Sequence, residues 1–324
     1  MDSKPLAVIE EDLRRVQRLL EDFAQSRAEL VPAVYRHALD GGGKRLRPAL
    51  ALLCAKALGC TDGRVIKLAA AAELIHIASM IHDDVVDQAD RRRGRPAANV
   101  NWDNRTSVLV ADFVVAKVYA DLARDQELHA LAAFATAVDR MCEGELLHMQ
   151  ARHRSGALTE EQYYGVVRDK TGMLMAACCE VGAHTAGAGA DTVGELRAYG
   201  AELGTAFQIA DDLLDLVGDP EQMGKPVGND LGTGKLTLPI LYALRQSPDG
   251  LRERISALSG SGSISRRDLD EVVSLVDAAG GISYARRAAR LFADRATTHL
   301  HVLPPSPTRD ALAQLPEHVV QRTH

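Results

Sequence analysis

The sequence predicts an all-α protein, and two features of its pattern support this. Apolar residues recur at spacings of three and four almost throughout the 324-residue chain, as in helices with one buried face, whereas the alternation typical of strands is nearly absent. The composition is that of a globular protein, with 46% hydrophobic and 25% charged residues and a formal net charge of -6.

Glycine, proline and polar clusters divide this pattern into helical segments. In chain order, we expect helices at about residues 6–25, 28–39, 45–58, 62–88, 103–124, 127–153, 159–187, 192–217, 236–246, 266–278, 281–301 and 307–321. Residues 65–81 are apolar on most of their circumference, so neighbouring helices must surround them. This favours a single large bundle. Because no linker is evident, we expect residues 1–324 to form one domain.

Composition and patterning exclude several classes of protein. The chain has no long Lys/Arg block, so a nucleic-acid footprint is not expected. The first twenty residues interleave charged with apolar side chains, and charges interrupt the most apolar stretches, residues 65–81 and 108–123. We therefore expect no signal peptide, no membrane span and a cytoplasmic location. The five cysteines lack metal-site spacing and are expected to be reduced thiols.

Two aspartate-rich motifs carry the strongest chemical signal. Asp83, Asp84 and Asp87 lie at positions i, i+1 and i+4 of a predicted helix, within a roughly 100° arc of one face. The same spacing recurs at the end of another apolar helix, in Asp211, Asp212 and Asp215. A solvated acidic face is the alternative interpretation, and repetition weakens it. Carboxylates are ligands of Mg²⁺, which also takes phosphate oxygens, so the motifs favour a diphosphate bridged by Mg²⁺.

Basic residues beside glycines suit such a diphosphate. Three glycines at 41–43 precede Lys44 and Arg47 at the start of a predicted helix, whose amides favour an anion. Arginines 91–93 and 95 follow the first motif and either bind phosphate or neutralise the nearby aspartates. Lys225 and Lys235 lie in a glycine-rich segment, 218–235, with the composition of a lid.

Taken together, the motifs resemble those of a known family. GGGKRLRP, ELIHIASMIHDDVVD, RRRGRP, KTG, FQIADDLLD and GKPVGNDLGTGKLTLP, in this order over about residues 35–245, resemble the trans-isoprenyl diphosphate synthases. The resemblance implies a helical bundle around a deep central cavity, the isoprenoid synthase type of fold. It also implies a homodimer, with the two aspartate motifs facing each other across the cavity.

The resemblance also implies a role for each matching residue. About three Mg²⁺ ions would be ligated by Asp83, Asp87 and Asp211, with Asp84, Asp212 and Asp215 ligating them or holding their waters. The remaining contacts to the allylic diphosphate would come from Arg92, Lys170, Thr171, Gln208 and Lys225, and Lys235 adds to the substrate contacts. The diphosphate of isopentenyl diphosphate would be held by Lys44, Arg47, His76 and Arg93, where His76 stands in place of the Gln of some relatives.

The implied reaction is head-to-tail chain elongation that gives a long-chain all-trans polyprenyl diphosphate. The allylic C–O bond ionises, the isopentenyl double bond attacks and a proton is lost, with metal ions and cations stabilising the departing diphosphate. Positioning and electrostatics supply most of the catalysis, and no Ser, Cys or His nucleophile is needed.

The residues one helical turn before Asp83 bear on product length. Side chains at i and i+4 lie on one face, so we expect Ala78 and Ser79 to face the cavity beneath the metal ions. In the family, aromatic residues here stop the growing chain early, and small residues let it pass. Deeper positions are expected at Leu74, Ile75 and Ala71, with a floor formed by Phe134, Val138 and Met141. The alternative is that Ala78 and Ser79 are small only to permit close helix packing.

Other functions remain as alternatives. A short-chain farnesyl or geranylgeranyl diphosphate synthase would share every motif. A class I terpene cyclase usually lacks the second aspartate motif, and a non-catalytic synthase subunit typically loses its aspartates. Two E-x-x-H sequences, at 73–76 and 145–148, also match di-iron carboxylate bundles, which leave both aspartate motifs unexplained. A long product implies transient membrane association for release. The segment 108–119 is either a dimer interface or core.

Overall fold

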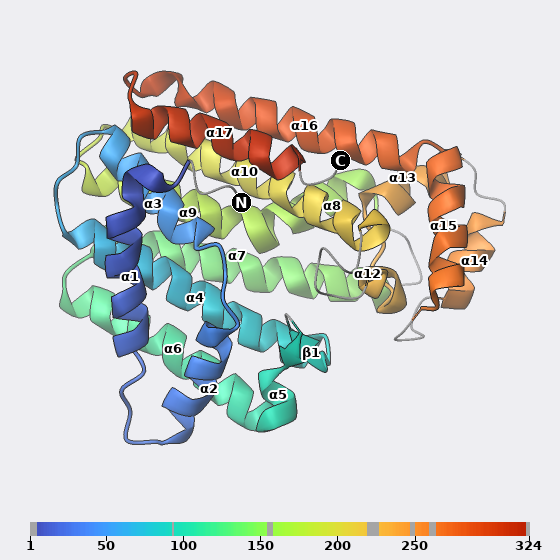
Figure 1. The fold of residues 1–324 in the computed structure, drawn as a ribbon, viewed down its shortest axis with the longest axis horizontal. Helices are drawn as coiled ribbons and strands as arrows, with labels where there is room; N and C mark the ends of the chain where they lie inside the picture. Colours follow the sequence, from blue (N-terminus) through green and yellow to red (C-terminus); the bar gives the residue numbers. More distant parts are fainter. Residues whose placement is uncertain are drawn as a thin grey trace. The chain divides into compact units, whose positions relative to one another are not determined.

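The described residues are all-α apart from one short two-stranded hairpin, as the periodicity predicted. A computed structural model describes residues 5–92, 94–153, 158–218, 227–246, 250–258 and 264–321 (Figure 1). The chain divides into two compact units. Unit 1 comprises Met1–Val138, Leu174–Gly200 and His299–Gln314, and unit 2 comprises Asp139–Met173, Ala201–Thr298 and Leu315–His324. The expectation of a single domain over residues 1–324 stays a prediction.

Unit 1 holds the N-terminal helices. Its elements are η1 (Ala7–Ile9), α1 (Glu10–Asp22), α2 (Leu30–Asp40), α3 (Leu46–Ala57), α4 (Arg64–Val86), β1 (Arg91–Arg92), β2 (Arg95–Pro96), α5 (Ala98–Asn101), α6 (Asn104–Arg124), most of α9 (Met173–Thr185) and η3 (His299–Val302). The boundary between the units falls within three further helices, α7 (Leu128–His153), α10 (Ala190–Val217) and α17 (Pro307–Gln321).

Helix α4 is the central helix of unit 1, because it packs against α1, α2, α3, α5 and α6 (Figure 1). Apolar side chains around its whole circumference are buried, which explains why its sequence has no polar face. Among the described residues, it is the one helix long and apolar enough to cross a membrane by length and composition. However, 78% of its most apolar window is buried inside the protein. Such burial is expected of a core helix.

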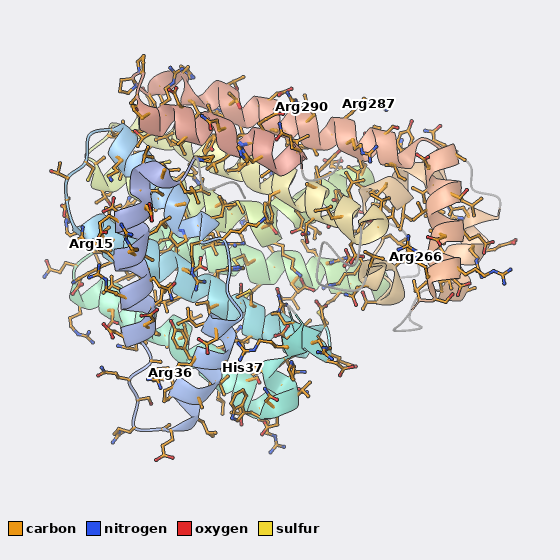
Figure 2. All side chains as sticks on the ribbon, in the orientation of Figure 1. Arg15, Arg36, His37, Arg266, Arg287 and Arg290 are labelled. Carbon is orange, nitrogen blue, oxygen red and sulfur yellow. The ribbon has the colours of Figure 1, made fainter. Side chains whose placement is uncertain are left out.

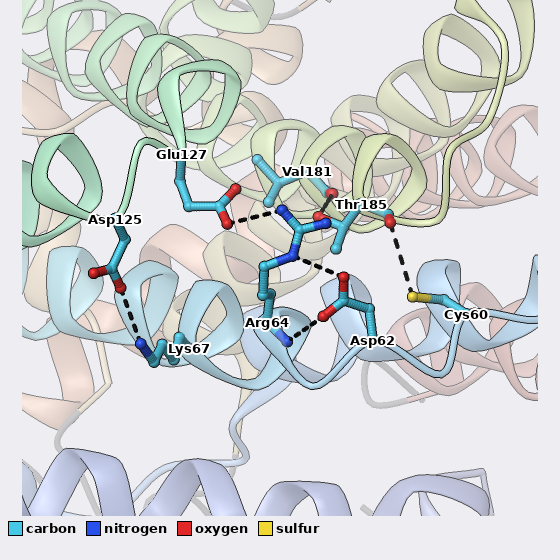
Figure 3. Close-up of polar contacts among 8 residues, drawn as sticks. All are labelled: Cys60, Asp62, Arg64, Lys67, Asp125, Glu127, Val181 and Thr185. Carbon is cyan, nitrogen blue, oxygen red and sulfur yellow. Dashed lines mark hydrogen bonds and ion pairs between the residues drawn. The ribbon is translucent and has the colours of Figure 1, made fainter.

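Polar contacts tie together the turns at the N-terminal end of α4 (Figure 3). The Arg64 guanidinium donates to Asp62, 2.7 Å away, and to Glu127, 3.2 Å away, in the turn before α7. Lys67 pairs with Asp125 at 3.0 Å. Apart from Glu127, these groups are at least about one-third exposed, so each pair contributes little, roughly 0–1 kcal/mol.

Unit 2 contains the remaining helices. Its elements are α8 (Glu160–Val167), the π-helix η2 (Arg168–Gly172), α12 (Asn229–Gly232), α13 (Leu238–Gln246), α14 (Leu251–Leu258), α15 (Arg266–Ala278) and α16 (Gly281–Thr298), together with parts of α7, α10 and α17. Helix α16 packs against α13 and α15, and one apolar cluster runs from Tyr163 on α8 through Leu213 on α10 to Val272 on α15.

The elements agree with the sequence prediction except in a few short segments. The hairpin of β1 and β2, the single-turn helices α5 and α12, and α14 were not predicted. Each is at most eight residues long, too short for a helical period to be recognised. The predicted helix at 159–187 is interrupted by η2, and Gly187 ends it in the left-handed region with φ +75°.

The candidate active site

The first aspartate motif ends helix α4, and its middle carboxylate is anchored by an arginine. Asp84 is 4% exposed, and its Oδ1 accepts a hydrogen bond from Nε of Arg92 at 2.6 Å. Burial raises the pKa of Asp84, and the charge of Arg92 opposes that rise. Asp83 and Asp87, in contrast, are only half-buried. The two outer carboxylates therefore keep exposed surface while the middle one is fixed.

Arg92 is positioned by the β1–β2 turn that follows α4. Gly94 adopts φ +78°, a conformation that glycine reaches without strain, and its carbonyl oxygen accepts from Arg91 at 2.6 Å. A cleft beside the turn is lined by Gly41, Met80, Asp84, Arg92 and Arg95, among others. His37 of α2, marked in Figure 2, also lines this cleft, and its Nε2 lies 2.8 Å from the Pro96 carbonyl oxygen.

The glycine-rich segment before α3 is held by an ion pair that the sequence analysis did not single out. Arg45 has φ +49°, and its Nη1 lies 2.8 Å from Oε1 of Glu73 on α4. The Glu73 side chain is 4% exposed and the Arg45 side chain 16% exposed. This buried pair fixes the segment that carries Lys44, which is exposed, and Arg47, which is half-buried. His76 is also half-buried, one turn after Glu73 on α4.

The second aspartate motif lies near the C-terminal end of α10, and its middle carboxylate is held by neutral groups. Oδ2 of Asp212 accepts from the Tyr163 hydroxyl at 2.5 Å, and Oδ1 accepts from Nε2 of Gln208 at 2.8 Å. The Gln208 amide oxygen in turn accepts from the Thr171 hydroxyl at 2.8 Å. Burial and the charge of Asp230 raise the pKa of Asp212 to about 8. Burial also raises the pKa of Tyr163, so its hydroxyl remains a donor.

Asp215 fastens the backbone that precedes α12. Its carboxylate accepts from the amide of Asp230 at 3.0 Å, and its carbonyl oxygen accepts from the amide of Gly228 at 2.6 Å. Asp215 is buried, whereas Asp211 is half-buried. Lys235 belongs to the same segment, since its amide donates to the Asp230 carbonyl oxygen at 2.7 Å. Asp211 is therefore the most accessible carboxylate of the second motif.

The KTG sequence lies in the π-helix η2, a rare geometry found mostly at functional sites. Lys170 pairs with Glu145 of α7 at 2.5 Å, and Thr171 is buried. Close packing supports this turn, because a Cβ on Gly204 of α10 would lie 2.6 Å from Cα of Gly172. No residue larger than glycine fits there without a shift of the backbone.

The predicted chain-length residues are buried or half-buried. Ala78 is 0% exposed and Ile75 1%, while Ser79 is half-buried and donates its hydroxyl to the His76 carbonyl oxygen at 2.9 Å. Leu74, Ala71 and Phe134 are also buried, whereas Val138 and Met141 are half-buried. Their role in product length stays a prediction.

Some predicted residues lie outside the described part of the chain, namely Arg93 and Lys225. The di-iron alternative also loses support, since the first glutamate of each E-x-x-H sequence is ion-paired, Glu73 with Arg45 and Glu145 with Lys170. Within the described residues, no group of three or more His, Cys, Asp or Glu side chains forms a site that could hold a metal ion by itself.

Sequence reasoning missed four of the residues that fix the site: Arg45, Glu145, Tyr163 and Asp230. Arg45 stood within a quoted motif, and its left-handed backbone had no sequence signal. Tyr163 lies seven residues before Lys170, two helical turns away and thus on the same face, which is a signal that could have been used. The partners of Glu145 and Asp230 are distant in sequence, so only the fold brings them together.

Comparison with known proteins agrees with this arrangement. The family model described as polyprenyl synthetase matches residues 28–276. The chain is 36% identical over 311 residues to an all-trans-nonaprenyl-diphosphate synthase (geranyl-diphosphate specific) from Rhodobacter capsulatus, covering 96% of this chain and 94% of that protein. It is also 36% identical to a short chain isoprenyl diphosphate synthase from Methanothermobacter thermautotrophicus, covering 95% of each.

Among solved structures, a polyprenyl synthase from Caulobacter crescentus CB15, complexed with calcium and isoprenyl diphosphate, superposes with a TM-score of 0.93. That protein is 35% identical, and the match covers 99% of this chain and 98% of that one. The chain therefore belongs to the polyprenyl synthetase family, the trans-prenyltransferases that build polyprenyl diphosphates by chain elongation.

Proposed function

We propose that this protein condenses an allylic diphosphate with successive molecules of isopentenyl diphosphate to give a long-chain all-trans polyprenyl diphosphate. In each round, the C–O bond of the allylic substrate breaks and a new C–C bond forms to the isopentenyl double bond. A proton is lost from the isopentenyl unit, and the released diphosphate accepts it.

One observation carries this proposal: the two aspartate motifs share the same pattern of burial and hydrogen bonding. In each, the middle aspartate is buried and hydrogen-bonded, Asp84 to Arg92 and Asp212 to Tyr163 and Gln208, while an outer aspartate keeps exposed surface. A merely solvated acidic face would not need a buried anchor at the same place in two motifs.

The half-buried carboxylates fit hard divalent cations. Asp83, Asp87 and Asp211 are oxygen donors of the kind that Mg²⁺ prefers, and a relative was crystallised with calcium and isoprenyl diphosphate. We assign to these residues, with Asp84 and Asp215 in support, a set of about three Mg²⁺ ions. When bound, these ions supply positive charge to the departing diphosphate.

The basic and polar side chains bind and orient the two diphosphates. Arg92 and Lys170, with Thr171 and Gln208, are assigned to the allylic diphosphate, and Lys44, Arg47 and His76 to isopentenyl diphosphate. Lys170 already has an acidic partner, Glu145, which holds its ammonium in place. Fixed cations stabilise leaving-group charge without reorganising, which is the main source of catalysis available to a site that lacks a nucleophile.

Small side chains before the first motif support a long product. Ala78 and Ser79 occupy the turn preceding Asp83, and neither is aromatic. A short-chain product remains the second candidate, favoured by the short chain isoprenyl diphosphate synthase of equal identity.

For the assembled protein, we propose one domain over residues 1–324, a homodimer, and a cytoplasmic location with transient membrane association for product release. Leu109 of α6 is 67% exposed, within the segment 108–119. Sedimentation of the purified protein should give a mass twice that of the 34.9 kDa chain.

Product analysis tests the proposed reaction. Purified protein is incubated with Mg²⁺, labelled isopentenyl diphosphate and, in separate reactions, geranyl, farnesyl or geranylgeranyl diphosphate. The products are dephosphorylated and separated by chain length. Linear products longer than the primer by many units support the proposal. Products of three or four isoprene units favour the short-chain candidate, and cyclic hydrocarbons favour a cyclase. The absence of product with every primer contradicts the proposed reaction.

A further inference from the structure

The two middle aspartates are anchored by different chemistry. Asp84 pairs with a guanidinium, so the first motif gains a positive charge where its carboxylate is fixed. Asp212 receives its hydrogen bonds from a phenol and an amide, both neutral. The second motif is therefore held in place by two neutral donors.

The hydrogen bonds form one continuous chain through unit 2. It runs from the Thr171 hydroxyl to the amide oxygen of Gln208, from the Gln208 amide nitrogen to Oδ1 of Asp212, and from the Tyr163 hydroxyl to Oδ2. Both hydroxyls donate in this chain, and the Gln208 amide accepts from Thr171 through its oxygen and donates to Asp212 through its nitrogen. Tyr163, Thr171 and Asp212 are each at most 6% exposed, so water does not replace these bonds.

We propose that Tyr163 is a positioning residue of the prenyl transfer reaction. It acts through Asp212 and Gln208, and so fixes the second aspartate motif and Thr171. This inference rests on the proposed function. The role fits the phenol, because a group that orients a metal ligand does so by a hydrogen bond to it.

Replacing Tyr163 by Phe tests the role, because it removes one oxygen and keeps the ring. Tyr164→Phe is the matched control, since the hydroxyl of Tyr164 donates to Glu160, outside the chain of bonds, at 3.0 Å. Loss of a group that orients a metal ligand lowers metal affinity by about 10–100-fold. We expect Tyr163→Phe to raise both the Mg²⁺ concentration for half-maximal rate and the KM for the allylic diphosphate by about tenfold. The KM for isopentenyl diphosphate should change less than twofold.

A second readout needs no metal and no turnover. Backbone amide exchange is measured in the metal-free protein for wild type and both variants. Loss of the Tyr163 bond should speed exchange in residues 168–172 and 208–215, and Tyr164→Phe should not. A Tyr163→Phe protein with the same Mg²⁺ dependence, allylic KM and exchange as Tyr164→Phe overturns the inference.

Two outcomes need a different measurement, namely a Tyr163→Phe protein that does not fold and a wild type that makes no product. If Tyr163→Phe does not fold, Thr171→Val cuts the other end of the chain of bonds. It should raise exchange in residues 208–215, and unchanged exchange there overturns the inference. If wild type makes no prenyl product with any primer, the proposed function fails, while the exchange experiment in the metal-free protein still decides whether Tyr163 fixes the motif.

Discussion

At the scale of single residues, the site depends on buried charged side chains whose partners lie on other helices or turns. Sequence patterns identified the six aspartates and most of the basic residues, because these recur in motifs. They did not identify Arg45 or Tyr163, whose importance comes from contacts with Glu73 and Asp212 on other helices. A local pattern cannot encode which distant side chain will need a partner.

The Arg45–Glu73 pair gives the first prediction. Replacing Arg45 by Met leaves the Glu73 carboxylate buried without its cation, and we expect unfolding free energy to fall by about 3–5 kcal/mol. Adding Glu73→Leu should recover much of this loss, because an apolar pair of similar volume packs at no electrostatic penalty. Urea denaturation of the two variants measures both effects.

An exposed pair is the control for this experiment. Lys67→Met breaks the contact to Asp125. The Lys67 side chain is 66% exposed and the Asp125 side chain 43%, so unfolding free energy should change by less than about 1 kcal/mol. An Arg45→Met protein as stable as Lys67→Met would show that the buried pair does not hold the segment before α3.

Ser79 gives a prediction about product length. Ser79→Phe places an aromatic ring one turn before Asp83 on α4, and we expect shorter products with early condensations preserved. Ser283→Phe, at an exposed position of α16, is the control for adding a ring and should leave the products unchanged. Chromatography of the dephosphorylated products measures chain length, and an unchanged distribution for Ser79→Phe refutes the assignment.

At the scale of elements, helices were predictable wherever they are long. Helices α6 and α10 carry many turns of an apolar pattern with helical spacing, and the apolar run of α4 is too long for a strand. The π-helix η2 was not recognisable from the sequence, because one extra residue in a turn leaves the surrounding apolar pattern almost unchanged. Glycines mark where helices approach closely, yet the sequence alone does not say which helix each one meets.

Gly182 tests the packing of α9 against α3. A Cβ at this position would lie 2.3 Å from the Ala51 carbonyl oxygen, so the two helices must separate to accept it. We expect Gly182→Ala to lower unfolding free energy by about 1–3 kcal/mol through overpacking. Thermal or urea denaturation measures the loss.

Gly194 is the matched control, since it lies in helix α10 and a Cβ there meets nothing within 4 Å. Gly194→Ala should stabilise the protein by about 0.5–1 kcal/mol, because alanine loses less backbone entropy in a helix. If both substitutions had the same sign, close approach at Gly182 would not govern the packing of α3 and α9.

At the scale of the whole molecule, an interior this apolar restricts the pH range of stability. The expectation of reduced thiols is confirmed, since all five cysteines are free and Cys54, Cys178 and Cys179 are buried, although Cys142 is exposed. Burial is the main cause that raises the pKa of Cys178 and of the phenols Tyr35 and Tyr199. All of these groups are therefore neutral in the folded protein and ionise more readily when it unfolds.

The sign of the pH effect follows from proton binding. Unfolded thiols and phenols titrate near pH 8.5 and 10, about their ordinary values, and the folded groups titrate higher. Above about pH 9, the folded state binds more protons than the unfolded state, so stability falls as pH rises. Each such group contributes a slope of about 1.4 kcal/mol per pH unit once its unfolded form is ionised. Urea midpoints at pH 7.5, 9 and 10.5 should therefore decrease in that order.

A variant separates this cause from general alkaline damage. Cys178→Ala removes one buried thiol, so the free energy lost between pH 9 and 10 should be smaller by about 1 kcal/mol, although the variant is less stable at neutral pH. If unfolding free energy fell with pH at the same rate in both proteins, this thiol would not be shielded from ionisation. If the urea midpoints stayed constant up to pH 10.5, the buried phenols would not be shielded either. The interior would then admit water, which contradicts the packing of unit 1 around α4.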